Sequence, residues 1–442
     1  MSLIPFGFWA ASGAGAGNYW LATLGGASSE TAKSGVTDSE NNLYAFGYSI
    51  SAGSGLNDFF LAKYDTAGAV QWQRVLGGSG QEQGFSNAID SLDNIYVAGY
   101  TGSTGAGGND FLFAKYSSAG VIQWQRILGG SSTDEAEAVA VDSSDDVYLL
   151  GVTQSEGGGT HNILLAKYNS SGTLQWQRIL GGSSAQFGYA LSFDSSDNVY
   201  VLGNTFGEGA GSADLLLAKY NSSGALQWQR ILGGSGAEVG YGAAVDSDSN
   251  LYVLGSTSSQ GAGSSDILLA KYNSSGTLQW QRILGGSDPD QGFKVKLDAD
   301  NNPYVLGETE SAGEGGKDWL LAKYNSSGTL QFQRVLGASG SDDRPGLAIS
   351  SDGSIHILGE TNSAGEGGND LFVSALPSDG SLTGTYELDG VNFVYAVSTL
   401  TAATSTLTAA TSTRTAATST LTAATSTLTA GSASLTEHLV EL

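Results

Sequence analysis

The chain has 442 residues, of which 65 are Gly, 5 are Pro and none is Cys. Lys and Arg total 18 against 43 Asp and Glu, a formal net charge of −25 that argues against binding nucleic-acid phosphates. Without Cys, neither disulfides nor thiol chemistry can contribute. Abundant Gly with Trp, Tyr and Ser is typical of many short strands joined by tight turns.

The first 18 residues are apolar at the start and then rich in Gly and Ala. They lack the basic start of a secretory signal, and the apolar run is too short to span a bilayer. We interpret residues 1–18 as an anchoring or docking arm, with a cryptic leader as the alternative. No other stretch of the chain predicts a membrane span.

Residues 19–390 are predicted to contain seven copies of a 52-residue unit. The stretch LLAKYNSSGTLQWQRILGG, at Leu164–Gly182, has near-copies at this step, and eight corner leucines from Leu24 to Leu388 enclose seven repeats. In the fourth repeat the strand patterns cover 188–194, 199–205, 215–220 and 226–232. Four strands repeated at a fixed long period, with no helical pattern, predict an all-β, seven-bladed β-propeller.

Within Leu164–Gly182, small polar residues and Gly172 predict a tight turn between two strands. Simple pairing would put Trp176 on the same face as Ala166 and Tyr168. The spacing Ala166, Gly172, Trp176 resembles the tryptophan-docking motif of quinoprotein-type propellers, which implies packing between blades. The aromatic residues at this position are Trp20, Trp72, Trp124, Trp176, Trp228, Trp280 and Phe332.

Two segments compete to supply the outer strand of the last blade. The N-terminal segment Tyr19–Leu24 aligns with the outer half of the hairpin, whereas Leu382–Leu388 occupies the matching register in the seventh repeat but lacks the Trp. Propeller rings are commonly closed by a strand from the other terminus. We therefore predict that residues 19–24 close the ring.

The repeat also resembles the bacterial family of seven-bladed β-propeller repeats (SBBP-like). The counterparts of its corner and hairpin motifs are RILGG at Arg178–Gly182 and AVAVDSSDDVYLLG at Ala138–Gly151. The resemblance extends from Tyr19 to about Leu388 and implies an extracellular or surface-exposed propeller. It implies no particular activity.

Residues 391–442 are predicted to form a separate tail. From Ser398 its composition changes to Ser, Thr, Ala and Leu, and STLTAAT recurs every seven residues. On a helix this pattern would form a stripe of Leu and Ala suited to a trimeric stalk. Thr and Ser are poor helix formers and charged flanking positions are missing, so a flexible low-complexity tail is an equal alternative.

Few residues suggest catalysis. The three histidines, His161, His356 and His438, occupy unrelated places, and no nucleophile elbow is present. We predict no catalytic residues, no metal site and no cofactor. Calcium is the best metal alternative, because Asp246–Asn250 and Asp298–Asn302 concentrate oxygen ligands and because Gly108–Leu112 resembles a glycine- and aspartate-rich calcium repeat.

Recurring charges are predicted to serve the repeat. Two acidic series are interpreted as turn caps, and the strand Lys and Arg residues as bridges to carboxylates between blades. The first acidic series is Asp38, Asp90, Asp142, Asp194, Asp246 and Asp298, and the second is Asp58, Asp110, Asn162, Asp214, Asp266, Asp318 and Asp370.

Residues that break the repeat are the candidates for function. The predicted ligand face comprises Phe206, Glu310, Glu314 and Glu366, in the loops between second and third strands, with Glu308 and Glu360 beside them. These loops suit weak, multivalent polar contacts, for example with glycans, rather than one deep pocket.

The leading prediction is a non-enzymatic, surface-exposed structural or adhesin-type propeller, on a virion or outside a cell. It would bind a host-surface glycan or another structural protein, and would self-associate as a homo-oligomer. The opening LIPFGFWAASGAG, at Leu3–Gly15, resembles structural proteins of marine bacteriophages and favours a virion. One alternative is a purely structural shell or filament subunit assembled through arm and tail, and another is a carbohydrate-active enzyme.

Overall fold

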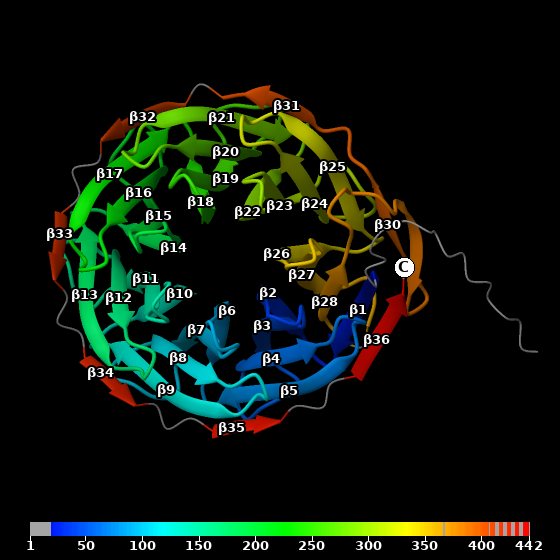
Figure 1. Ribbon diagram of the computed structural model, residues 1–442, viewed down its shortest axis with the longest axis horizontal. Helices are drawn as coiled ribbons and strands as arrows, with labels where there is room; N and C mark the ends of the chain where they lie inside the picture. The colour runs from blue at the N-terminus through cyan, green and yellow to red at the C-terminus, as the bar shows by residue number, and fades with distance from the viewer. Residues whose placement is uncertain are drawn as a thin grey trace, which may run out of the picture.

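The computed structural model of the chain describes residues 19–365, 367–405, 407–411, 415–418, 422–425, 429–432 and 436–441. They form seven β-sheets set as blades around a central axis, which confirms the predicted seven-bladed propeller (Figure 1). The N-terminal arm, residues 1–18, lies outside the described residues. Among those described, no helix is long and apolar enough to cross a bilayer.

Each blade has four antiparallel strands, numbered here from the axis outward. The inner strands are β2 (Glu30–Thr37), β6 (Glu82–Ile89), β10 (Asp134–Val141), β14 (Gln186–Phe193), β18 (Glu238–Val245), β22 (Asp290–Leu297) and β26 (Asp342–Ile349). The second strands are β3 (Leu43–Ser49), β7 (Ile95–Thr101), β11 (Val147–Thr153), β15 (Val199–Thr205), β19 (Leu251–Thr257), β23 (Pro303–Thr309) and β27 (Ile355–Thr361). The third strands are β4 (Asp58–Tyr64), β8 (Asp110–Tyr116), β12 (Asn162–Tyr168), β16 (Asp214–Tyr220), β20 (Asp266–Tyr272), β24 (Asp318–Tyr324) and β28 (Asp370–Ala375). The fourth strands are β5 (Val70–Gly77), β9 (Ile122–Gly129), β13 (Leu174–Gly181), β17 (Leu226–Gly233), β21 (Leu278–Gly285), β25 (Leu330–Gly337) and, in the seventh blade, β1 (Trp20–Gly25).

The N-terminal strand closes the ring, as predicted. β1 pairs antiparallel with β28, with Trp20 opposite Ala375 and Leu24 opposite Leu371. Trp20 is only 1% exposed, so this strand is fully part of the core. The competing segment instead forms β29 (Gly384–Leu388), which pairs with β30 (Val391–Val397) at the edge of the sixth blade.

A β-bulge shifts the register of every described outer hairpin. In the third blade Tyr168 pairs with Leu174, but Lys167 pairs with Trp176, so Gln175 has no opposite residue. Opposite residues of an antiparallel pair share a face, so Trp176 lies with Lys167 rather than with Tyr168. The simple pairing expected from the sequence was wrong here because the extra residue moves the outer half of the hairpin by one position.

A Trp and an Arg on the fourth strand join each of the first five blades to the next, as the third blade illustrates. The indole N–H of Trp176 donates to the Ser222 carbonyl at 3.2 Å, and the ring packs on Gly224 in the next blade's outer turn. Gly224 has a φ of +77°, and a Cβ there would lie 3.0 Å from the Trp176 ring. Arg178 stacks on the same indole and donates from Nε to the Gly224 carbonyl at 2.8 Å. We call this arrangement the interblade clamp.

The basic residues of the repeat have two separate roles, neither of which is the predicted bridge to a carboxylate of another blade. The clamp arginines donate to carbonyl oxygens, and the lysines form ion pairs within their own blade. Lys219 lies 2.9 Å from Asp194, whose other oxygen accepts the N–H groups of Ser196 and Asn198. This confirms Asp194 as a turn cap. Burial opposes ionisation, but the hydrogen bonds from Lys219 and Asn198 hold the pKa of Asp194 below its usual value.

The second acidic series caps the loops that precede the third strands. Asp58 accepts the backbone N–H of Ser54 at 2.8 Å, as predicted. In the sixth blade, burial and the neighbouring charge of Asp342 raise the pKa of Asp318 to about 8. Both carboxyl groups are almost completely buried.

The tail forms strands, not the helical stalk or flexible tail left open by the sequence. β30 pairs with β25, and six further segments each add a fifth strand to one blade. They pass round the ring in the order opposite to the blades, as the orange and red strands at the rim of Figure 1 show. They are β31 (Thr401–Thr404) on β21, β32 (Thr408–Thr411) on β17, β33 (Thr415–Thr418) on β13, β34 (Thr422–Thr425) on β9, β35 (Thr429–Ser432) on β5 and β36 (Thr436–Glu441) on β1.

The seven-residue period of the tail therefore matches one step between blades rather than two turns of a helix. Its Thr residues favour strands, and the fourth strand of each blade offers an unpaired edge. Leu400 and Leu407 are 8% and 5% exposed, and each is anchored at its carbonyl by an amide N–H, from Gln333 and Gln281 respectively, at 2.9 Å. The trimer expected from the heptads stays a prediction.

Trp20→Ala should lower the free energy of unfolding by about 3–5 kcal/mol, because it removes a fully buried indole from the strand that closes the ring. Trp176→Ala should cost less, about 2–3 kcal/mol, because that ring is partly exposed. Gln175→Ala, at the exposed bulge position, is the control. Denaturant titration measures all three, and equal effects of the two Trp substitutions would contradict the placement of the rings.

Leu407→Asp should release the neighbouring tail strands, because it puts a charge where a buried leucine anchors the tail. Hydrogen exchange should become faster in β31, β32 and the strands they cover, β17 and β21. Val397→Asp is the matched control, since Val397 is 63% exposed. Unchanged exchange in the Leu407 variant would show that the leucine does not hold the tail.

Asp318→Asn should stabilise the protein by about 1–2 kcal/mol at pH 8 and by much less at pH 5. A carboxyl whose pKa is raised in the folded state binds its proton more tightly than in the unfolded chain, so its stability contribution falls as pH rises from about 4 to 8. The chain already has amides at the equivalent pair, Asn162 and Gln186. Asp194→Asn should instead destabilise at pH 8, and thermal unfolding at both pH values distinguishes the two.

Candidate functional site

A second bulge brings one residue of each blade into the central channel. In blade one, Ala32 pairs with Gly47 and Ser34 with Phe46, which leaves Lys33 unpaired. Such a bulge changes the direction in which a side chain points, and here the side chain of Lys33 points toward the axis. The corresponding residues recur every 52 positions, and all of them line one axial cavity. They are Lys33, Phe85, Glu137, Tyr189, Tyr241, Phe293 and Pro345.

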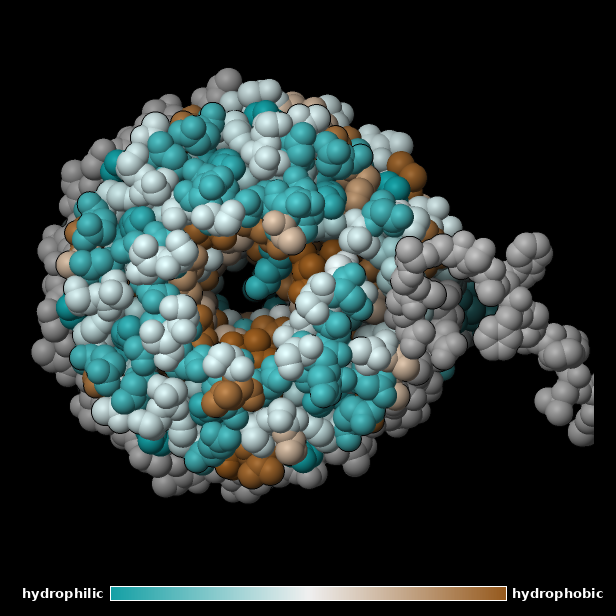
Figure 2. Space-filling model, in the orientation of Figure 1, coloured by the Kyte–Doolittle hydropathy of each residue, from teal (hydrophilic) through white to brown (hydrophobic). Residues whose placement is uncertain are grey.

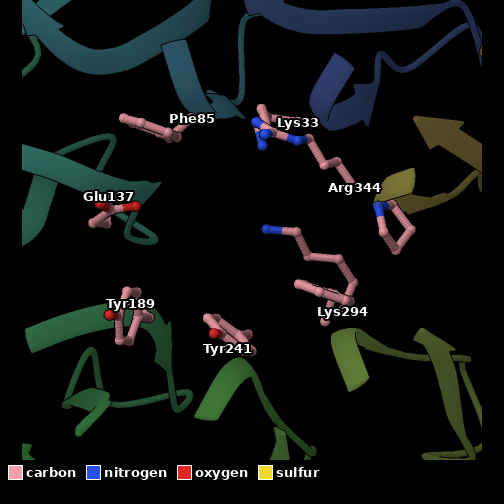
Figure 3. A pocket seen from close by; sticks show the side chains of 9 residues that line it. Lys33, Phe85, Glu137, Tyr189, Tyr241, Lys294 and Arg344 are labelled. Atoms are coloured by element: carbon pink, nitrogen blue, oxygen red, sulfur yellow. The ribbon is translucent and has the colours of Figure 1, made fainter. Parts of the chain in front are cut away.

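Lys294 and Arg344 complete the lining of this axial cavity, which has a volume of about 170 Å³ (Figure 3). A second cavity of about 240 Å³ adjoins it further along the channel and shares Glu137, Tyr189, Tyr241 and Lys294. Together they reach the range of roughly 300–1,000 Å³ typical of small-ligand sites. Figure 2 shows the open channel, with hydrophobic residues on much of its wall.

Aromatic rings form a continuous series from the loops to the channel. Phe206 meets Phe187 edge to face with centroids 5.8 Å apart, and Phe187 stacks on Tyr189 at 6.3 Å. Tyr189 lies 5.3 Å from Tyr241, which stacks on Phe293 at 5.1 Å. We call these five residues the aromatic arc. It gives one side of the channel an extended apolar surface with two phenol hydroxyl groups.

Charged groups, together with Phe85 and Pro345, occupy the rest of the lining. Figure 3 shows Lys294 extending into the channel from one side and Glu137 facing it from the other. Burial lowers the pKa values of Lys33 and Lys294 to about 8. Burial, together with the charge of Glu135, raises the pKa of Glu137 to about 7. Near neutral pH these groups can therefore change their charge in response to a ligand.

Arg344 is fixed where the seventh blade departs from the repeat. Its Nε lies 3.0 Å from the Glu360 carboxylate, and its Nη1 donates to the Tyr48 hydroxyl at 2.9 Å. Its backbone N–H donates to Glu308 at 2.6 Å, and Glu308 also pairs with Lys317. Pro345 next to it has no N–H for the ladder, which accounts for the irregular register of β26 and β27 here.

The predicted ligand-face residues do not form one site. Glu308 and Glu360 are both buried and are brought together around Arg344. Phe206 is 41% exposed and starts the aromatic arc. Glu310 is exposed in its loop, Glu314 lines a separate hollow beside β30, and Glu366 lies outside the described residues.

The histidines and the calcium candidates either have structural roles or have no role in the axial site. Burial lowers the pKa of His356 to about 4, and its Nδ1 contacts the Ser374 carbonyl. His161 packs on Phe187 at the outer end of the arc. Asp246 is bound by Asn250 and Lys271, so its oxygens are committed to the turn and the ion pair. Among the described residues, no group of three or more His, Cys, Asp or Glu could hold a metal ion.

The sequence prediction did not include the channel residues, because the ligand face was expected in the loops. The sequence does contain a signal: at the position of Lys33 the seven repeats carry Lys, Phe, Glu, Tyr, Tyr, Phe and Pro, whereas the positions directly before and after it carry mostly Gly, Ala or Ser. A position that varies inside a regular repeat is free of the demands of blade packing. On the inner strand, a varied position between two positions of small residues is a candidate to face the axis.

Comparison with known proteins identifies the repeat. The Beta-propeller repeat family (SBBP) matches residues 175–208 and 227–261, and a beta-propeller domain of unknown function (DUF5122) matches residues 247–278. "Uncharacterized WD repeat-containing protein L264" of Acanthamoeba polyphaga mimivirus is 22% identical over 54% of this chain and 18% of its own length. "Regulatory protein FlaEY" of Caulobacter vibrioides is 24% identical over 79% of this chain and 38% of its own length. The chain thus spans less than half of either relative.

Solved structures with the same architecture have very different sequences. Polysaccharide lyase Uly1 aligns with a TM-score of 0.50 and 9% identity over 79% of this chain and 90% of its own. Puromycin hydrolase aligns with a TM-score of 0.47 and 12% identity over 78% of this chain and 51% of its own. The likeness to the lyase shows the fold alone. The chain is a seven-bladed β-propeller, and two stretches of its repeats match the SBBP beta-propeller repeat.

Proposed function

We propose that the protein is a non-enzymatic, adhesin-type propeller that binds a glycan in its axial channel, on a virion or a cell surface. The aromatic arc is the observation that carries this proposal. Aromatic faces carry partial negative charge and attract the C–H faces of a pyranose ring. The arc offers several such faces in sequence, from exposed Phe206 to Phe293 in the channel.

The polar groups of the lining suit a saccharide as well. Tyr189 and Tyr241 supply hydroxyl groups that both donate and accept hydrogen bonds, and Lys33 and Lys294 supply donors. A site of this kind differs from the multivalent loop face expected from the sequence, because its contacts converge on one cavity. The exposed outer end at Phe206 allows a longer chain to enter from the surface.

The surface location belongs to the same proposal. It is supported by the resemblance of the arm to structural proteins of marine bacteriophages. A purely structural subunit joined through its tail is less favoured, because the described tail strands are used within the chain's own ring.

Tyr241→Ala should weaken glycan binding at least tenfold, because it removes the ring of the arc that joins Tyr189 to Phe293 in the cavity. Phe206→Ala should weaken binding of longer oligosaccharides more than that of short ones, since Phe206 lies at the outer end. Leu92→Ala, which changes an exposed side chain in a turn between first and second strands, is the control. A glycan array followed by calorimetry on the positive sugars measures these effects.

Binding that is identical in all three variants would place the glycan elsewhere, and absence of binding across the array would overturn the proposal. The same incubations should be analysed for cleavage products by chromatography. Turnover of any sugar that disappears with Glu137→Gln would instead make the channel an active site.

A further inference from the structure

The cations of this acidic chain are distributed unevenly. Twelve of the 18 basic residues occupy repeat positions, as strand lysines or clamp arginines. Of the remaining six, Lys33, Lys294 and Arg344 line the axial cavity, and Lys296 lines the cavity that adjoins it. The channel therefore has a cationic lining within a protein whose formal net charge is −25.

The channel lysines also lack counter-charges. Each of the six strand lysines lies within about 3.1 Å of an Asp of its own blade. In the described part of the chain, Lys33, Lys294 and Lys296 form no ion pair, although acidic residues outnumber basic ones more than two to one. Lys33 and Lys294 are partly buried and Lys296 is exposed, so an entering anion would supply Lys33 and Lys294 with the counter-charge that they lack.

We propose that the saccharide bound in the channel is acidic, and that Lys33, Lys294 and Arg344 hold its carboxylate or sulfate group. This inference rests on the proposed glycan binding and specifies its chemistry. The aromatic arc receives the apolar face of the sugar, while Lys294, next to Phe293 on β22, receives the acidic substituent together with Lys33 and Arg344 of the first and seventh blades. A free inorganic anion would use the cations alone and leave the arc uncovered.

The charge of the whole molecule restricts how such a ligand binds. A long polyanion lying across the ring would meet a surface of strongly negative net charge and be repelled. Screening by salt limits the range of this repulsion to roughly 8 Å at physiological ionic strength. A short acidic saccharide, or the acidic end of a longer chain, avoids it by entering the channel. End-on binding is therefore expected.

The affinity for an acidic saccharide should fall as pH rises from 6 to 9. The groups that face the bound acid are Lys33 of β2, Glu137 of β10, Lys294 and Lys296 of β22 and Arg344 of β26, with Tyr189 and Tyr241 beside them. Glu135 lies near Glu137 but is engaged by Asn109. At pH 6 Glu137 is mostly neutral and the lysines are charged, whereas at pH 9 Glu137 is charged and Lys33 and Lys294 are mostly neutral.

The decisive probes are short oligogalacturonides and the same oligosaccharides with their carboxylates methyl-esterified. Sulfated galactan oligosaccharides form a second arm that distinguishes sulfate from carboxylate recognition, and inorganic phosphate tests a bare anion. Calorimetry with the full chain should show acidic oligosaccharides binding about 10–100-fold more tightly than neutral ones at pH 6, as expected for added charge-assisted hydrogen bonds. Equal affinity for the acid and its ester would overturn the inference, whereas no binding of either would overturn the proposed function itself.

Two substitutions in the same cavity should act with opposite signs. Lys294→Met should weaken binding of the acidic oligosaccharide about tenfold or more and leave the neutral ester unaffected. Glu137→Gln should strengthen binding of the acid at pH 8 and flatten the pH profile between 6 and 8. Disturbed packing would weaken both ligands in both variants, and that outcome would also overturn the electrostatic assignment.

Discussion

The interblade clamp is the interaction on which the molecule depends. A blade of four short strands cannot bury both of its faces alone, so each must pack on its neighbours. Trp176 and Arg178 reach the outer turn of the next blade, where Gly224 leaves room for the indole. The same Arg-to-Gly-carbonyl contact recurs from blade to blade, with Nε–O distances of 2.6–3.0 Å.

The joint between the last blade and the first is different. Trp20 supplies the indole, donates to the Thr66 carbonyl and stacks on Tyr64, but Ala22 stands where the other blades have Arg. Tail strand β36 then pairs along the outside of β1. The closing strand is thus held by complete burial and by strand pairing on both sides, in place of the cation that the other joints use.

The same regularity explains how the site arises. Because the clamp, the Lys–Asp pair and the turn caps supply the stability of each blade, the bulged position of the inner strand is free to differ between blades. The seven side chains at that position, of five kinds, give the symmetric ring an asymmetric channel, with aromatic residues from the fourth to the sixth blade and charges from the first and third. Arg344 and Pro345 show the largest departure, where the ladder itself becomes irregular.

The sequence by itself determined the number of repeats, the four strands of each and the strand that closes the ring. In the fourth blade the expected strand limits agree with β14 to β17 within two residues. These features depend on local pattern and on period, which the chain displays directly. The roles of Asp194 and Asp58 as turn caps could also be predicted, since both act on residues four positions away or fewer.

Only the tertiary structure decided the path of the tail and the place of the site. A period of seven fits two turns of a helix as well as one step between blades, and the choice depends on the open edges of distant strands. Likewise, Lys33 and Lys294 are 261 positions apart, and they meet because ring closure brings every inner strand to one axis. A local sequence pattern does not predict this contact, because the contact forms only when all seven blades are assembled.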